Sequence, residues 1–195
     1  MSKRNNSNKR VDSTIEYIDD LSDEFSKLNI VRVDLSYKKP YSDTMSLEDV
    51  NKDLDRMANN MRSKPTIFKH KIGHVLKREY TEDKGVHLHA MFIFNGQKII
   101  SDTYKADEIG KYWEKTTADK GTYHNCNRNN YDKKGIGMLD YKDSEKRKIL
   151  DEIVIPYMCK DDQDIGVLKG DKRSKAFTRG IVTKKKSSKG RPRDK

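Results

Sequence analysis

Apolar residues recur every three or four positions in three segments of the chain, and this spacing predicts three helices. The first begins at Ser13, where "STIE" reads as a capping box. The second begins at Ser46, where "SLED" has the same form, and the third covers residues 103–117. A charged stretch over residues 142–154 continues the helical pattern, and Pro156 after it either opens a new helix or kinks this one.

Alternating apolar and polar positions predict strands elsewhere. Residues 29–37 alternate cleanly, and residues 71–80 and 86–94 flank the turn sequence "TEDKG", which indicates a β-hairpin. Residues 136–141 predict a short strand, whereas residues 121–130 are polar and read as irregular. The order of elements indicates an α+β fold in which a central antiparallel β-sheet packs flanking helices on one side.

Composition sets the size of the core and the class of partner. Of the 195 residues, 33% are hydrophobic and 37% charged, which favours a single domain over residues 13–182. The polar, basic residues 1–12 are expected to be disordered, and residues 183–195 form a basic tail. The net charge of +11 favours a polyanionic partner, most commonly a nucleic acid.

Cysteine usage and hydropathy bear on the compartment. Cys126 and Cys159 form neither a CxxC pair nor a disulfide framework, as expected for a reducing environment. No apolar run approaches the length of a membrane helix. These features predict a cytoplasmic protein with no membrane partner.

Two histidines one residue apart stand in the otherwise apolar strand "GVHLHAMFIFNG". Side chains two positions apart share one face of a strand, so His87 and His89 are neighbours. If the hairpin turn is centred near Asp83, Glu79 lies across from His87 on the same face. One carboxylate and two imidazoles suit Mg²⁺ or Mn²⁺ as a Lewis acid and can also hold Zn²⁺. The alternative is a polar sheet face that binds no metal.

The sequence "YMCK" places Tyr157 and Lys160 three residues apart, which puts both on one face if the segment is helical. A tyrosine hydroxyl is a weak nucleophile unless a cation or metal activates it. Lys160 can stabilise the charge that develops on a phosphate during such an attack. The alternative is a buried tyrosine beside a surface lysine, which is the commoner reason for this pattern.

The basic tail offers further contacts to a polyanion. Its "KGRPR" is similar to the Gly-Arg-Pro core of segments that lie in AT-rich minor grooves, although nonspecific attraction to phosphates is the first interpretation. The predicted DNA-binding residues of the tail are Lys184, Lys185, Lys186, Arg191 and Arg193.

The strand "VRVDLSY", the strand "HLHAMFIF" and the later "YMCK" occur in the order of the three motifs of the HUH endonuclease superfamily. The chain resembles in particular the rolling-circle replication initiators (Rep proteins) with one catalytic tyrosine. The stretches "GVHLHAMFIFNG", "GTYHNCN" and "IPYMCKDDQ" are similar to inovirus-type replication endonucleases of phages and prophages.

The resemblance implies a role for individual residues. His87 and His89 are the metal-binding pair, Glu79 is the acidic ligand from the preceding strand, Tyr157 is the nucleophile, and Lys160 is the lysine of the same motif. Asp34 receives no role. The resemblance further implies that the first-motif strand and the histidine strand are adjacent central strands, with the tyrosine helix packed against them.

The predicted function is site-specific nicking of single-stranded DNA to initiate rolling-circle replication. The tyrosine would form a covalent 5′-phosphotyrosine and leave a 3′-hydroxyl primer, with Mg²⁺ or Mn²⁺ as the only cofactor. The partners would be single-stranded or origin DNA, a host polymerase and, because the chain contains no GxxxxGK[ST] loop, a host helicase. The alternatives are an HUH-fold transposase or relaxase, a non-catalytic DNA-binding regulator, and a small metallohydrolase.

Overall fold

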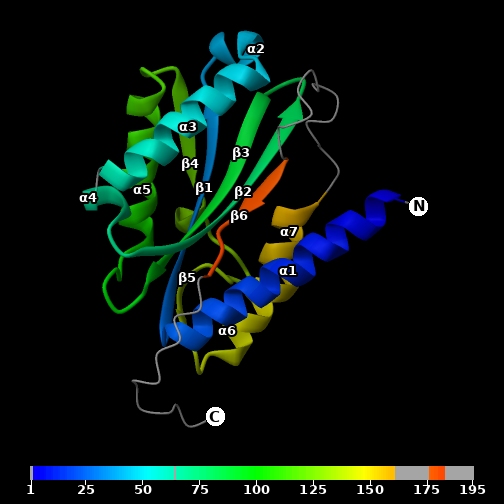
Figure 1. Ribbon diagram of the computed structural model, residues 1–195, viewed down its shortest axis with the longest axis vertical. Coiled ribbons are helices and arrows are strands. Elements are labelled where there is room, and N and C mark those ends of the chain that lie inside the picture. Colours follow the sequence, from blue (N-terminus) through cyan, green and yellow to red (C-terminus); the bar gives the residue numbers. More distant parts are fainter. Residues whose placement is uncertain (1, 64, 161–175, 183–195) are drawn as a thin grey trace.

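The fold is built on a six-stranded antiparallel sheet (Figure 1). A computed structural model describes residues 2–63, 65–160 and 176–182 of the chain. The sheet has the order β4-β1-β3-β2-β6, and β5 also pairs with β1. The strands are β1 (Lys27–Tyr37), β2 (Lys71–Thr81), β3 (Gly85–Asn95), β4 (Gly121–Asn125), β5 (Gly137–Asp140) and β6 (Phe177–Arg179). The predicted α+β class with a central antiparallel sheet is confirmed.

Helices flank this sheet. They are α1 (Ser2–Glu24), α2 (Tyr41–Thr44), α3 (Leu47–Ser63), α4 (Pro65–Phe68), α5 (Asp102–Thr116), α6 (Ser144–Ile149) and α7 (Ile155–Cys159). A 3₁₀ turn, η1 (Cys126–Arg128), follows β4, and a π-helical turn, η2 (Leu150–Val154), joins α6 to α7. In the described part of the chain, no helix is both long and apolar enough to cross a membrane.

The helices cover both faces of the sheet, whereas the sequence predicted them on one side. Figure 1 shows α3, α4 and α5 on one face and α1, α6 and α7 on the other. The reason lies in β3, which is buried at every position from Gly85 to Phe94. Leu88 and Phe92 pack with α3 and α5, while Met91 and Ile93 point the other way into an apolar cluster with α1 and α7. A strand that is apolar on both sides needs cover on both sides.

Several predicted elements form where expected. The strands at residues 29–37, 71–80, 86–94 and 136–141 correspond to β1, β2, β3 and β5, and the third helix corresponds to α5. The capping box at the start of α3 is confirmed: Asp49 donates its N–H to the Ser46 hydroxyl at 3.2 Å, and Ser46 donates its N–H to the Asp49 carboxylate at 3.2 Å.

The first helix begins earlier than predicted. It runs from Ser2, so residues 2–12 are helical where disorder was expected, and Ser13 lies inside the helix. The Ser13 hydroxyl donates to the Arg10 carbonyl at 3.2 Å instead of capping. The cause is tertiary contact: Val11 packs on the apolar cluster, and the Ser7 hydroxyl donates to the Cys159 carbonyl at 2.9 Å. Packing against α7 thus stabilises a polar segment as helix.

The segment at residues 121–130 is ordered as β4 and η1, although its polar sequence predicted irregular structure. β4 pairs with the second half of β1, and β5 pairs with the first half. The Asn127 side chain fills the space between them: it accepts from the Arg32 N–H at 2.7 Å and donates to the Ile30 carbonyl at 3.0 Å. An amide side chain therefore continues the hydrogen-bonding ladder where the backbone does not.

The charged stretch before Pro156 is not one regular helix. It comprises α6 and then the π-helical turn η2, and α7 opens with Pro156 in its first turn. Proline has no N–H to donate, so it fits a helix start better than a helix interior. Because the helical backbone is continuous from residue 144 to residue 159, Pro156 does not open a separate helix but follows the π-helical turn within the same run.

Candidate metal centre and nucleophile

Glu79, His87 and His89 come together on one face of the β2–β3 hairpin. Glu79 lies directly across from His87 in the register of the two strands, as the turn position predicted. One potential ligand atom from each of the three residues lies within 4.8 Å of the others, and all three residues are buried. Central strands hold these side chains, so their positions are set by the sheet and not by a loop.

Hydrogen bonds orient both imidazoles toward the same carboxylate oxygen. Nδ1 of His87 donates to the Gly85 carbonyl at 3.2 Å, and Nδ1 of His89 donates to the Asp34 carboxylate at 2.7 Å. The two Nε2 atoms then face Oε2 of Glu79, at 3.4 Å from His87 and 2.9 Å from His89. Histidines that bind metals have this arrangement, in which one nitrogen is held by an acceptor and the other faces the ion. The donor set therefore fits a divalent cation.

The charges around Glu79 keep it ionised. Burial alone would raise the pKa of its carboxyl, but hydrogen bonds from His87, His89 and Lys77 hold that pKa well below its usual range. Lys77 is almost fully buried and forms an ion pair with the second carboxylate oxygen, Oε1. Burial opposes the protonation of His89, yet its hydrogen bonds to Asp34 and Glu79 raise its pKa. Glu79 is therefore ionised, as a carboxylate ligand of a divalent cation must be.

Tyr157 lies beside the histidines. Its ring centroid is 5.6 Å from that of His89, and the two planes meet at 76°. The residue projects from α7 and is 42% exposed. The Tyr157 ring contacts His89, so the expected packing of the tyrosine helix against the histidine strand is confirmed. The first-motif strand β1 is the neighbour of β3, as the resemblance implied.

Two cations surround the Tyr157 ring. The guanidinium carbon of Arg32 lies 4.5 Å from the ring centroid, and Nζ of Lys160 lies 5.6 Å from it. Lys160 follows the last residue of α7 and has an extended backbone, with ψ of 145°, so it does not share a helix face with Tyr157. Its flexible side chain nevertheless returns to the ring. Both cations can stabilise negative charge near the phenol oxygen.

Sequence reasoning missed three residues of this site: Asp34, Lys77 and Arg32. Asp34 pairs with His89 across β1 and β3, and Lys77 pairs with His89 across β2 and β3. The signal for Lys77 was present, since it is two residues from Glu79 and therefore on the same strand face. The signal for Asp34 required the register between β1 and β3, which no local pattern provides.

The remaining predicted residues lie elsewhere. The DNA-binding residues assigned to the tail, Lys184, Lys185, Lys186, Arg191 and Arg193, lie outside the described residues. His124 is exposed on β4, and its Nε2 donates a hydrogen bond of 2.9 Å to the side-chain carbonyl oxygen of Asn129. The neighbouring Cys126 is buried, and burial raises the pKa of its thiol to about 12.

Comparison with known families gives one match, which spans most of the chain. The model of the YagK/YfjJ C-terminal domain matches residues 1–180. The chain belongs to the YagK/YfjJ C-terminal domain family. No curated protein and no solved structure matches it. In this YagK/YfjJ domain the matched span contains the metal-site candidate, Tyr157 and Lys160, and it includes the N-terminal helix that packs on α7.

Proposed function

We propose that this YagK/YfjJ domain nicks single-stranded DNA at a specific site through a covalent tyrosine intermediate and thereby initiates rolling-circle replication. The observation that carries the proposal is the position of Tyr157, an accessible phenol 5.6 Å, between ring centroids, from a histidine whose Nε2 faces a carboxylate. A nucleophile next to a site for a divalent cation is the arrangement that phosphoryl transfer to a hydroxyl group requires.

The chemical step is a transfer of a phosphodiester from one oxygen to another. The Tyr157 oxygen forms a bond to phosphorus, the bond from phosphorus to the 3′-oxygen breaks, and the phenol proton passes to solvent while the leaving 3′-oxygen takes up a proton. The products are a 5′-phosphotyrosine and a free 3′-hydroxyl, which a polymerase can extend. Because the linkage keeps the phosphodiester energy, the reverse attack rejoins the strand.

Each group of the site has a task in this scheme. Glu79, His87 and His89 would hold Mg²⁺ or Mn²⁺, which when bound polarises a non-bridging phosphate oxygen. Arg32 and Lys160, the cations nearest the phenol, would balance the charge on the attacking oxygen and on the phosphate. The net charge of +11 supports attraction of the DNA backbone, so binding should weaken as salt rises.

The decisive experiment detects the covalent intermediate. A single-stranded oligonucleotide pool of random sequence, labelled at the 3′ end, is incubated with the protein and Mn²⁺ and then run on a denaturing gel. We expect a labelled, denaturant-resistant adduct with the wild type, none with Tyr157→Phe, and an undiminished adduct with Tyr141→Phe, a matched change at another exposed tyrosine. An adduct that persists in Tyr157→Phe, or that never forms in the wild type, rejects the proposal.

The metal requirement is tested in the same assay. The double variant His87→Ala, His89→Ala should lose the adduct, as should the wild type in excess EDTA. His70→Asn removes an exposed histidine from the turn before β2, where asparagine tolerates the positive φ, and should retain full activity. If the double variant forms the adduct at the wild-type rate, these imidazoles do not hold the catalytic cation.

A further inference from the structure

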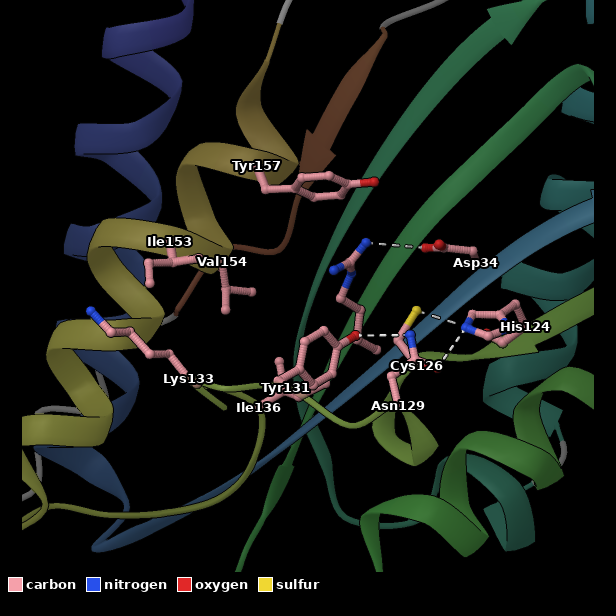
Figure 2. A pocket seen from close by; sticks show the side chains of 12 residues that line it. Asp34, His124, Cys126, Asn129, Tyr131, Lys133, Ile136, Ile153, Val154 and Tyr157 are labelled. Atoms are coloured by element: carbon pink, nitrogen blue, oxygen red, sulfur yellow. Dashed lines mark hydrogen bonds and ion pairs between the residues drawn. The ribbon is translucent and has the colours of Figure 1, made fainter.

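A pocket of about 340 Å³ adjoins the candidate active site on the side of β1 that carries β4. Figure 2 shows Tyr157 at one end of it, with Ile153 and Val154 on the helical side and His124, Cys126 and Asn129 on the opposite side. The volume lies in the range of small-molecule sites in proteins. A group that occupies this pocket would lie next to the tyrosine oxygen.

The walls suit a flat, aromatic ligand with polar edges. The apolar side is formed by Ile136, Ile153 and Val154, and the Tyr131 ring adds an aromatic surface. Bases of single-stranded nucleic acids bind in such places by stacking on aromatic rings, while their edges form hydrogen bonds. Arg32 and Lys133 at the same pocket can contact a neighbouring phosphate, whereas the aliphatic and aromatic walls fit the base itself.

The polar part of the pocket is held in place by its own hydrogen bonds. The Asn129 amide donates to the Tyr131 hydroxyl at 3.3 Å, and its carbonyl oxygen lies 2.9 Å from Nε2 of His124. Figure 2 shows these three side chains linked in a row along the pocket. This row fixes the orientation of the Tyr131 ring, so a stacking ligand would not have to order it.

A residue of the same pocket carries a buried donor that lacks an acceptor. Arg32 lines the pocket and is only 9% exposed, and among the residues that the structure describes its Nε has no hydrogen-bond partner. A buried N–H group without an acceptor is costly, and a carbonyl oxygen or ring nitrogen of a base would supply one. Because the Arg32 guanidinium also contacts the Tyr157 ring, a base held here is coupled directly to the nucleophile.

We infer that this pocket binds one nucleobase of the single strand, from the nucleotide next to the scissile phosphate. The inference rests on the proposed function and adds to it a site at which the strand is recognised. It assigns Tyr131 as the stacking residue and Arg32 as a hydrogen-bond donor to the base edge. Phosphate contacts position a strand without reading it, so this pocket would contribute to the choice of cleavage site.

The test separates binding of bases from binding of the backbone. Two fluorescent single strands of equal length and charge are compared by anisotropy in EDTA, so that no strand is cut: one of random sequence, and one made of abasic sites only. Tyr131→Ala should weaken binding of the base-bearing strand about tenfold and leave the abasic strand unchanged. Tyr131→Phe, which keeps the ring and loses only the hydrogen bond from Asn129, should weaken binding much less than Tyr131→Ala does. Tyr104→Ala, on the far face of the sheet and 64% exposed, is the matched control.

A second variant tests the same pocket independently, in case Tyr131→Ala does not fold. Ile153 is 46% exposed at the pocket, so Ile153→Trp can fill the space without disturbing the core. It should also weaken binding of the base-bearing strand only. Equal losses for both strands, or unchanged binding in both variants, would overturn the inference.

The outcome is independent of the nicking chemistry because no strand is cut in the binding assay. If the variants weaken binding of the base-bearing strand only, but no covalent adduct ever forms, the base-binding pocket is supported and the proposed function is rejected. An adduct at Tyr157 together with base-independent binding would do the reverse.

Discussion

Asp34→Asn removes a single negative charge next to the candidate metal centre and keeps the size and shape of the side chain. The Asp34 carboxylate accepts a hydrogen bond of 2.7 Å from Nδ1 of His89, which leaves Nε2 of that ring facing Glu79. Asparagine can still accept through its carbonyl oxygen, but without the negative charge that makes the imidazole a stronger ligand. We therefore expect weaker metal binding with the ligand set intact.

The magnitude follows from the strength of charged hydrogen bonds. A hydrogen bond to a charged group contributes about 1.5–3 kcal/mol, against about 0.5–1.5 kcal/mol for a neutral one. The midpoints of these ranges differ by about 1.2 kcal/mol, which corresponds to a loss of affinity of about eightfold. This is close to the 10- to 100-fold range that is general for partners of metal-binding histidines. The Asp34 side chain is 28% exposed, which places the expected loss of affinity at the lower end of that range.

Titration calorimetry with Mn²⁺ measures the affinity directly. Asp140→Asn, the same chemical change on β5 at the opposite end of β1, should bind Mn²⁺ as the wild type does. His89→Ala should abolish binding at the same concentrations. The reasoning is refuted if Asp34→Asn binds Mn²⁺ with unchanged affinity, or if its loss equals that of His89→Ala while circular dichroism shows an intact fold.

Three further changes test the packing and electrostatics of the fold. Gly110→Ala should destabilise the protein in urea unfolding in spite of alanine's higher helix propensity, because a Cβ there would lie 2.1 Å from the Tyr123 ring; Tyr123→Ala in the same chain should relieve the loss. Burial lowers the pKa of His74 to about 4, against about 6.5 in an unfolded chain, so the unfolded state takes up the proton first. The free energy of unfolding should then fall by up to about 1.4 kcal/mol per pH unit as the pH is lowered from 6.5 to 4. His74→Gln should flatten this slope, and above pH 7 the two proteins should show the same pH dependence. Ser46→Ala removes the acceptor for the Asp49 N–H at the start of α3 and should cost about 1 kcal/mol in the same unfolding assay, where an unchanged midpoint would contradict the capping role.

Local periodicity was sufficient to predict the hairpin and the metal-site candidate. The two-residue period of a strand places His87 and His89 on one face, and the short turn fixes which residue of the preceding strand faces them. Both relations involve residues close in sequence, so Glu79 could be located from the turn alone. The same reasoning failed for Asp34, because its pairing with His89 joins strands 55 positions apart.

Elements stabilised by tertiary contact could not be read from sequence. β4 has a polar sequence, and its strand structure depends on pairing with the second half of β1 and on the Asn127 side chain, which hydrogen-bonds to the β1 backbone between β4 and β5. α1 extends to Ser2 because α7 lies alongside it. Propensity and pattern describe isolated segments, whereas these segments are ordered by what they contact.

The placement of Tyr157 depends on elements that carry no chemistry. The cation ligands stand on central strands of a sheet that is buried on both faces, but the tyrosine stands on the five-residue helix α7. A helix this short is unstable by itself, so its position must come from its neighbours. Those neighbours are the π-helical turn before Pro156 and α1, whose Ser7 hydroxyl holds the Cys159 carbonyl one half-turn beyond the tyrosine. We therefore expect the N-terminal helix to set the distance between Tyr157 and the candidate metal centre, while the sheet sets the geometry of Glu79, His87 and His89.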